Sequence, residues 1–217
     1  MKIITDILNL YKERFSFFLE LLIQHMMLTL ISVSIITVIG LSTGILMTRN
    51  EGFAKVVLMV TNFMYTIPSI ALFGVLVIIT GIGNKSAIIA LVIYGLLPVI
   101  RNTYVGINEV DNQIIESAIG MGSTNIQLLL RVQLPLALPV IFAGFRTMVI
   151  MTIALCAIAS FIGAGGLGVA IWRGITTNFP EMTLAGSLLV ALLAIITDFI
   201  LEIVEKHMKK RIWGSVK

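Results

Sequence analysis

The stretch ESAIGMGSTNIQLLLRVQLPLALP, residues 116–139, decides how this chain must be organised. It combines a glutamate, two glycines and two prolines within a chain that is 58% hydrophobic and only 12% charged, with a mean hydropathy of +1.06. Soluble domains carry about 25% charged residues. A water-soluble fold of 217 residues could not bury this much apolar side chain, so the composition predicts an integral membrane protein.

Outward from this stretch, the chain divides into apolar segments long enough to cross a membrane, which takes about 20 residues. Backbone groups in lipid must bond within their own segment, and the alternation of barrel strands is absent, so the spans are predicted to be helices. The fold class is therefore an all-α membrane protein with five transmembrane helices. The predicted spans are 21–48, 56–80, 86–100, 137–160 and 182–204.

The two ends of the chain are predicted to lie on opposite sides of the membrane. Residues 1–20 scatter charges among apolar side chains, unlike a cleavable signal peptide, so we expect an amphipathic helix on the membrane surface. Most Lys and Arg outside the spans lie on the side of the C-terminus, which is therefore expected in the cytoplasm with the basic tail 206–217. The N-terminus is expected outside. The net charge of +4 reflects this anchoring and gives no reason to expect nucleic acid as a partner.

The loop over 108–135 is too polar to span and too structured to be a linker. Residues 113–120 place apolar side chains at helical spacing, and Gly122 suits the left-handed residue that ends a helix. Thr124 and Gln127 then form a capping box that predicts a second helix, which should end just before Pro135. We expect a cytoplasmic helix–turn–helix, and this shape favours a docking element for another protein over an inert connection.

The same residues carry a resemblance to a known family. The order Glu116-Ser117-Ala118, Gly122, Val132 and Leu134-Pro135 resembles the EAA motif of ABC-importer permeases. This chain has Ser117 where the family pattern has alanine, and Val132 where it has isoleucine. The resemblance implies that the loop inserts as a coupling helix into a cleft of a cytoplasmic ATPase. The residues implied in coupling are Glu116, Ser117, Ala118, Gly122, Thr124, Val132, Leu134 and Pro135.

Further stretches are similar to one branch of that family, the permeases of osmoprotectant importers. They are TIPSIALFG (66–74), LLPVIRNTYVGI (96–107), LPLALPVIFAGFRT (134–147) and FIGAGGLG (161–168). The likeness covers roughly residues 20–205 and implies a permease domain over 21–205 with the type I importer fold. Its cargo would be glycine betaine, carnitine, choline or related quaternary amines. Methionine-type permeases, which share the five-span plan, are the alternative.

The resemblance also implies the partners and the location in a bacterial cytoplasmic membrane. Two cytoplasmic ATPase subunits would drive alternating access, and a substrate-binding protein outside would deliver the solute. Five helices do not easily enclose a solute-sized pathway, so we expect a second permease chain, identical or homologous. No cofactor is expected in this chain, since ATP and Mg would bind to the ATPase.

Other motifs do not indicate a second chemistry. Gly163, Gly165 and Gly168 fit a dinucleotide fingerprint, but that signature needs a strand before it and a helix after it. We interpret these glycines as a turn at the outer end of the pathway. His25 and His207 are isolated from other ligands, so no metal site is predicted. No serine, histidine and acid arrangement suggests catalysis, so the chain is not expected to be an enzyme.

The charges within the predicted spans are few. Arg146 and Asp198 lie at similar depths in the fourth and fifth spans, so we expect them to pair and hold the two spans in register. A role in the pathway is the alternative. An autonomous channel or an ion-driven carrier would need a pore of ionisable residues, and only Arg146, Asp198 and Glu202 are available for it.

Prolines indicate where the pathway runs. Pro68 and Pro98 interrupt the hydrogen-bond ladder of a span, and such breaks border cavities more often than lipid. Tyr65 or Tyr94 could contact a quaternary ammonium group in passing, although both rings also suit ordinary packing. The residues expected near the pathway are Tyr65, Thr66, Pro68, Ser69, Tyr94 and Phe161.

Overall fold

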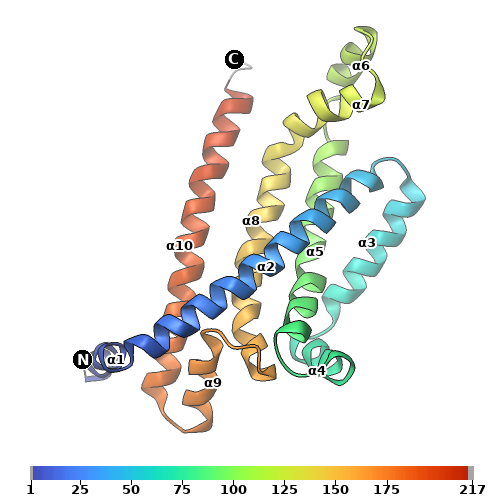
Figure 1. Cartoon of the computed structure of the whole chain (residues 1–217). Helices are drawn as coiled ribbons and strands as arrows, with labels where there is room; N and C mark the ends of the chain where they lie inside the picture. The colour runs from blue at the N-terminus through green and yellow to red at the C-terminus, as the bar shows by residue number, and fades with distance from the viewer. Residues whose placement is uncertain (1, 215–217) are drawn as a thin grey trace.

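The computed structural model describes residues 2–214, which are almost entirely helical and contain no strand. Figure 1 shows long helices side by side with short helices at both ends of the bundle. The predicted all-α class is confirmed. The helices are α1 (Lys2–Glu13), α2 (Phe15–Met47), α3 (Glu51–Thr66), α4 (Ser69–Thr80), α5 (Asn84–Asn108), α6 (Asn112–Gly120), α7 (Asn125–Leu128), α8 (Leu134–Ala159), α9 (Gly168–Thr176) and α10 (Pro180–Trp213).

Four helical segments among the described residues are long and apolar enough to cross a membrane, and the bent pair α3 and α4 makes a fifth if it counts as one span. The chain is a multi-pass membrane protein, and the predicted five spans agree with the structure when the bent pair is one of them. The four long segments are Phe15–Met47, Asn84–Asn108, Asn125–Ile162 and Pro180–Lys210.

The predicted span over 56–80 is not one helix, because α3 and α4 meet at an angle of 99°. Pro68 lacks a backbone N–H and pushes the preceding residue out of the helical region, and Ile67 is extended with ψ 129°. The hydroxyl of Tyr94 on α5 donates a hydrogen bond to the carbonyl of Ile67. The bend is therefore fixed by a contact from the bundle as well as by the proline.

Helix α5 forms the centre of the bundle and packs against α2 and α8. Small residues allow the backbones to approach closely, as is usual between membrane helices. A Cβ added at Gly44 on α2 would lie 2.6 Å from Cβ of Thr103 on α5. In the opposite direction, Ile36 of α2 fills the space over Gly95 of α5. The α2–α5 contact therefore depends on both glycines.

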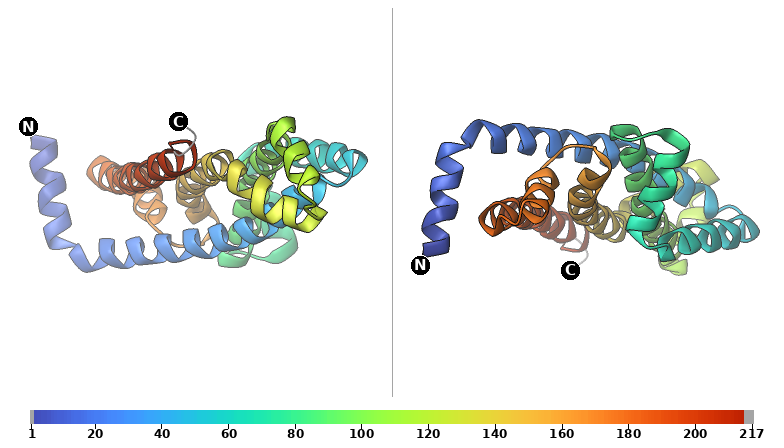
Figure 2. Two further views of the ribbon diagram at one scale, coloured as in Figure 1. Left: turned by 90° about the horizontal axis from the view of Figure 1, so that it is seen from above. Right: turned by 90° about the horizontal axis from the view of Figure 1, so that it is seen from below.

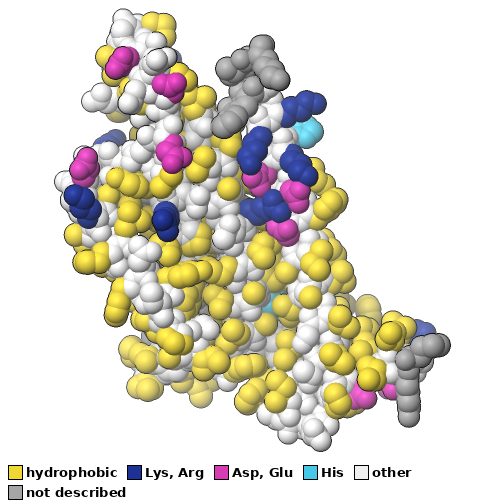
Figure 3. All heavy atoms as spheres, turned by 180° about the vertical axis from the view of Figure 1, so that it is seen from behind, with side chains coloured by type: hydrophobic (Ala, Val, Ile, Leu, Met, Phe, Trp, Pro, Cys, Tyr) yellow, Lys and Arg dark blue, Asp and Glu magenta, His cyan; other side chains and the backbone are white. Residues whose placement is uncertain are grey.

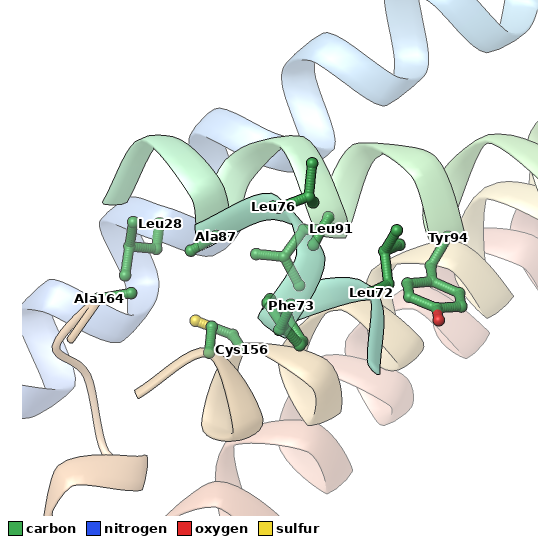
Figure 4. Packing of buried hydrophobic residues seen from close by; sticks show 11 residues of the cluster. Leu28, Leu72, Phe73, Leu76, Ala87, Leu91, Tyr94, Cys156 and Ala164 are labelled. Carbon is green, nitrogen blue, oxygen red and sulfur yellow. The ribbon is translucent and has the colours of Figure 1, made fainter. Parts of the chain in front are cut away.

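Helix α4 lies across one end of the bundle and packs apolar side chains against it. Phe73 is 1% exposed and packs with Leu91 of α5 and Cys156 of α8. Figure 4 shows side chains from α2, α4, α5 and α8 meeting in this cluster. Cys156 is buried among apolar groups and packs there as a small apolar side chain. This packing holds α4 across the end of the bundle instead of continuing the line of α3.

The N-terminal helix turns sharply away from α2 (Figure 2). The break lies at Arg14, so the last residues of the expected 1–20 surface segment begin α2 instead. Ile7 and Leu10 are buried in a cluster with residues of α10. The hydroxyl of Tyr11 donates to the carbonyl of Ala185 at 2.8 Å, and burial raises the pKa of this phenol. Helix α1 is thus attached to the start of α10.

The first and last described helices end at opposite ends of the bundle (Figure 1). Helix α1 lies near the end that carries α4 and α9, whereas α10 ends near the end that carries α6 and α7. Helix α10 continues to Trp213, so most of the expected tail 206–217 extends this helix, and 215–217 lie outside the described residues. On the face in Figure 3, charged side chains gather toward the α6–α7 end, above a broad apolar region.

Candidate functional site

The corner between α6 and α7 is built by local hydrogen bonds. Asp111 caps α6 by accepting from the N–H of Gln113 at 2.8 Å. After α6 the chain reverses through Gly122, which has φ +86°, a conformation that favours glycine. The N–H of Gly122 donates to Ile119, and that of Ser123 donates to Ala118, which satisfies the free carbonyls at the helix end.

Both hydrogen bonds of the predicted capping box are formed. The N–H of Gln127 donates to the Thr124 hydroxyl at 3.3 Å, and the N–H of Thr124 donates to the Gln127 side chain at 2.9 Å. This reciprocal pair satisfies two donors that would otherwise be free at the start of α7. The sharp turn between the two helices is therefore specified by residues within the corner itself.

The expected end of the second helix before Pro135 is wrong. The chain continues from α7 through a π-helical turn, Leu129–Gln133, directly into α8, and forms one helical segment from Asn125 to Ile162. The N–H of Leu134 bonds to the carbonyl of Leu129, five residues back. Pro135 lacks a backbone N–H and lies in the first turn of α8, directly after the π-helical turn. A proline is tolerated in the first turn of a helix. The corner is consequently continuous with α8.

The corner exposes an apolar surface that no described part of the chain covers. Within it only Ala118 and Leu128 are buried, and the main contacts of α6 are with α7 and the π-helical turn. Met121 is 82% exposed. Exposed apolar patches of this kind mark interaction sites. The large exposed apolar side chains are Ile114, Ile119, Met121, Ile126 and Leu130.

The residues predicted to couple to an ATPase fall into two groups. Glu116 and Ser117 are exposed on α6, with Ala118 buried beneath them, and Gly122 and Thr124 form the turn. The remaining residues lie at the junction with α8 and are half-buried, so they support the corner from below. These are Val132, Leu134 and Pro135.

Arg146 of α8 and Asp198 of α10 lie in contact. The guanidinium donates from Nε and Nη2 to both carboxylate oxygens of Asp198, at 2.6 and 2.9 Å. Glu202 accepts from the same Nη2 at 3.3 Å, and Glu205 accepts from Nη1 at 3.0 Å. The sequence prediction paired Arg146 with Asp198 alone and missed Glu202 and Glu205 as partners, although the spacing of 198, 202 and 205 places all three acids on one helix face.

A groove of about 640 Å³ runs beside this ion cluster, between α3, α8 and α10. Tyr65 lines it, and its hydroxyl contacts the sulfur of Met151 at 3.5 Å. Thr147 also lines it, together with the charged side chains of Arg146, Asp198 and Glu205. The groove therefore joins an aromatic ring, an apolar wall and ionised groups.

The other residues expected near the pathway do not all reach this groove. Tyr94 is buried, with its ring 6.1 Å from that of Tyr65. Thr66, Pro68 and Ser69 lie at the bend between α3 and α4. Phe161 packs against Trp172, with ring centroids 4.8 Å apart, in the turn before α9. Only Tyr65 of this set lines the groove.

The glycine-rich turn after α8 contacts α2. The side chain of Gln24 accepts from the N–H of Gly166 at 3.1 Å, and His25 packs beneath the same glycine. His25 is fully buried, and its Nε2 lies 3.1 Å from the carbonyl of Ile153. This turn lies between helices, and no group of metal-ligating residues occurs among residues 2–214.

Comparison with known proteins adds the following relationships. The family model described as "binding-protein-dependent transport system inner membrane component" matches residues 36–210. The glycine betaine/carnitine/choline transport system permease protein OpuCD of Bacillus subtilis is 38% identical, over 96% of this chain and 91% of that protein. The carnitine transport permease protein OpuCB of Listeria monocytogenes is 41% identical, over 82% of each.

Solved structures share the fold. A chain of the MetNI methionine ABC transporter in an inward-facing conformation superposes with a TM-score of 0.77 at 23% identity, over 88% of this chain and 95% of that one. A chain of an amino acid ABC transporter, solved with histidines, has a TM-score of 0.77 at 21% identity, over 92% and 97%.

Proposed function

The chain belongs to the binding-protein-dependent transport system inner membrane component family and is a membrane-spanning transport permease, and we propose that it serves an ATP-driven importer of osmoprotectants. The cargo is glycine betaine, carnitine, choline or a related quaternary amine. The relatives named for these solutes support this cargo, since they match most of the chain. A methionine or amino-acid cargo is the second candidate, but the likeness to such transporters extends to the fold alone.

The α6–α7 corner is the contact with the ATPase, and its uncovered apolar surface is the observation that carries this proposal. The sharp capped turn presents Met121 and Ile126 outward, where a partner's cleft can bury them. Since α7 continues into α8, a displacement of the corner moves a membrane-spanning helix directly. ATP and Mg bind to the partner, which carries out hydrolysis.

This assignment sets the orientation. The corner faces the cytoplasm, so the C-terminal end of α10 lies inside the cell, and α1 lies at the outer surface of a bacterial cytoplasmic membrane. The apolar residues that α1 leaves exposed, Ile3, Ile4 and Leu8, then face lipid at that surface. A substrate-binding protein delivers the solute at this outer end.

The groove between α3, α8 and α10 is one wall of the pathway. Ionised side chains cost free energy in lipid, so they face a bundle interior or a water-filled cavity instead. The Asp198 side chain is 43% exposed on this face, so this face does not lie against lipid. A second permease chain, identical or homologous, therefore faces this groove across the pathway. In this conformation the Arg146–Asp198 pair joins α8 to α10, and alternating access opens the groove to one side at a time.

Reconstitution of this chain with its ATPase and binding protein in liposomes tests the proposal. ATP-dependent uptake of labelled glycine betaine, carnitine or choline is expected, with none when the ATPase is left out. Uptake without the ATPase would indicate a channel, and uptake of methionine alone would indicate the other cargo class.

Two variants test the corner itself. Met121→Asp adds a charge to the exposed apolar surface and should abolish ATPase binding and uptake. Thr176→Asp adds the same charge at an exposed position of α9, at the opposite end of the bundle from the corner (Figure 1), and should leave ATPase binding intact. Equal behaviour of the two variants would show that the apolar surface is not the contact.

A further inference from the structure

Every ion pair among the described residues belongs to one cluster between α8 and α10. Arg146 is the cation that the three acids of α10 share. Two of these acids have a second partner, since Lys206 lies 2.5 Å from Glu202 and Lys209 lies 2.7 Å from Glu205. We call Asp198, Glu202 and Glu205 the carboxylate ladder.

The ladder offers Arg146 more than one register along α10. Its acids follow one another at four and three residues, so each step is about one helical turn, or roughly 5.4 Å. Toward the outer end the next residue on this face is Ala194, which cannot bind a guanidinium. Toward the inner end the next is Lys209, which repels one. Arg146 can therefore move by one step and no further.

The partners of the ladder allow this movement. If Arg146 moves toward Glu205, it leaves Asp198, whose side chain is 43% exposed in the groove and can be hydrated there. If it moves toward Asp198, it leaves Glu205, which keeps Lys209. Glu202 remains a partner in both cases, so neither register leaves the cation alone.

Helix α8 connects this cation to the cytoplasmic corner without a break. The π-helical turn and α8 form one continuous helix from the corner past Arg146. In the antiparallel arrangement of Figure 1, the inner ends of α8 and α10 lie toward the corner. A pull on the corner along the α8 axis therefore moves Arg146 along the ladder.

We propose that the carboxylate ladder is a two-position latch, in which Arg146 binds Asp198 and Glu202 in one transport state and Glu202 and Glu205 in the other. Small shifts become switches where an interface has two discrete packings, and one-turn steps of one element past another are known. A ligand shifts such an equilibrium only through unequal interaction with the two states. The latch rests on the proposed function, because the ATPase that binds at the corner interacts more strongly with one of the two states than with the other.

Distances between α8 and α10 test the latch in the permease itself. Spin labels on Leu138→Cys and Phe199→Cys, both exposed positions, would report the distance in lipid nanodiscs. The native cysteine is replaced by Cys156→Ala. Leu138 lies nearer the corner than Arg146, so movement of α8 toward the cytoplasm lengthens this distance.

Removing the charge of either end acid should shift the position of Arg146 along the ladder, in opposite directions for Asp198 and Glu205. Asp198→Asn should lengthen the label distance, by up to about 5 Å for a full step. In Glu205→Gln, the label distance should be shorter than in Asp198→Asn and no longer than in the unmodified protein. Glu202→Gln removes the shared acid, so it should broaden the distribution without moving its mean. A static clamp would give no opposite shifts, and that result would overturn the proposal.

A functional measurement separates the latch from a purely structural role. In the reconstituted importer, Asp198→Asn and Glu205→Gln should change ATP hydrolysis without cargo in opposite directions. Changes of the same sign, together with lower thermal stability in both variants, would instead indicate a clamp. Failure of the unmodified importer to take up any solute would refute the proposed function, while the label distances would still decide the latch.

Discussion

The turn at Gly122 allows a test in which backbone conformation is separated from side-chain packing. Gly122 and Gly120 lie two residues apart, and a Cβ added at either would meet no atom within 4 Å. They differ in backbone conformation, because Gly122 has φ +86° whereas Gly120 lies at the end of α6 without a positive φ. Alanine at the two positions should therefore have opposite effects.

The magnitudes follow from this difference. A left-handed conformation costs a residue with a Cβ about 1–2 kcal/mol, so Gly122→Ala should lower the ratio of ordered to disordered corner by roughly 5–30-fold. Replacing a helical glycine by alanine favours the helix by roughly 0.5–1 kcal/mol, so Gly120→Ala should stabilise α6. The bundle below should keep its stability in both variants, because the corner packs little against it.

Hydrogen exchange in nanodiscs, resolved over residues 112–128, measures the effect through local opening. Gly122→Ala should speed exchange there, and Gly120→Ala should slow it. The affinity for the ATPase should fall with Gly122→Ala and stay level or rise with Gly120→Ala. If both variants exchange at the same rate, the positive φ of Gly122 does not organise the corner.

Two further changes test the bundle. Gly44→Val forces side-chain atoms against Thr103 and should destabilise the protein by about 1–3 kcal/mol, seen as a lower melting temperature. Gly74→Val, which meets no atom within 4 Å, should cost much less, and an equal loss would contradict close packing of α2 on α5. Tyr94→Phe removes the hydrogen bond to Ile67 and should cost about 1 kcal/mol and loosen the bend, seen as faster exchange at residues 66–70. Faster exchange there in a variant elsewhere on α5, such as Tyr104→Phe, would show that the bond is not the cause.

Much of the corner could be predicted because its chemistry is local. The capping box needs only Thr124 and Gln127 three residues apart, and the turn needs a residue that tolerates a positive φ, which Gly122 supplies. Hydropathy likewise located the spans, because crossing lipid requires a minimum length of apolar helix. The corner depends on neighbours within a few residues, and each span depends on one continuous segment of the chain.

Prolines were harder to interpret, because their effect depends on what surrounds them. Pro68 indicated a break, but the 99° bend is held by Tyr94 and by the packing of Phe73 beneath the bundle. Pro135 was expected to end a helix, yet a π-helical turn carries the chain past it into α8. A proline removes one donor, and whether the chain then bends or continues depends on the surrounding structure, a tertiary contact at Pro68 and a π-helical turn before Pro135.

By itself, the sequence determined that the chain crosses the membrane several times and that one loop forms a capped helical corner. Only the tertiary structure decided that this corner is continuous with α8 and that Arg146 meets three acids instead of one. It also decided that α3, α8 and α10 enclose a groove beside those charges. The physical reason is distance along the chain, because hydropathy and capping act within one segment, whereas Arg146 and Glu205 are 59 positions apart and meet only when two helices pack.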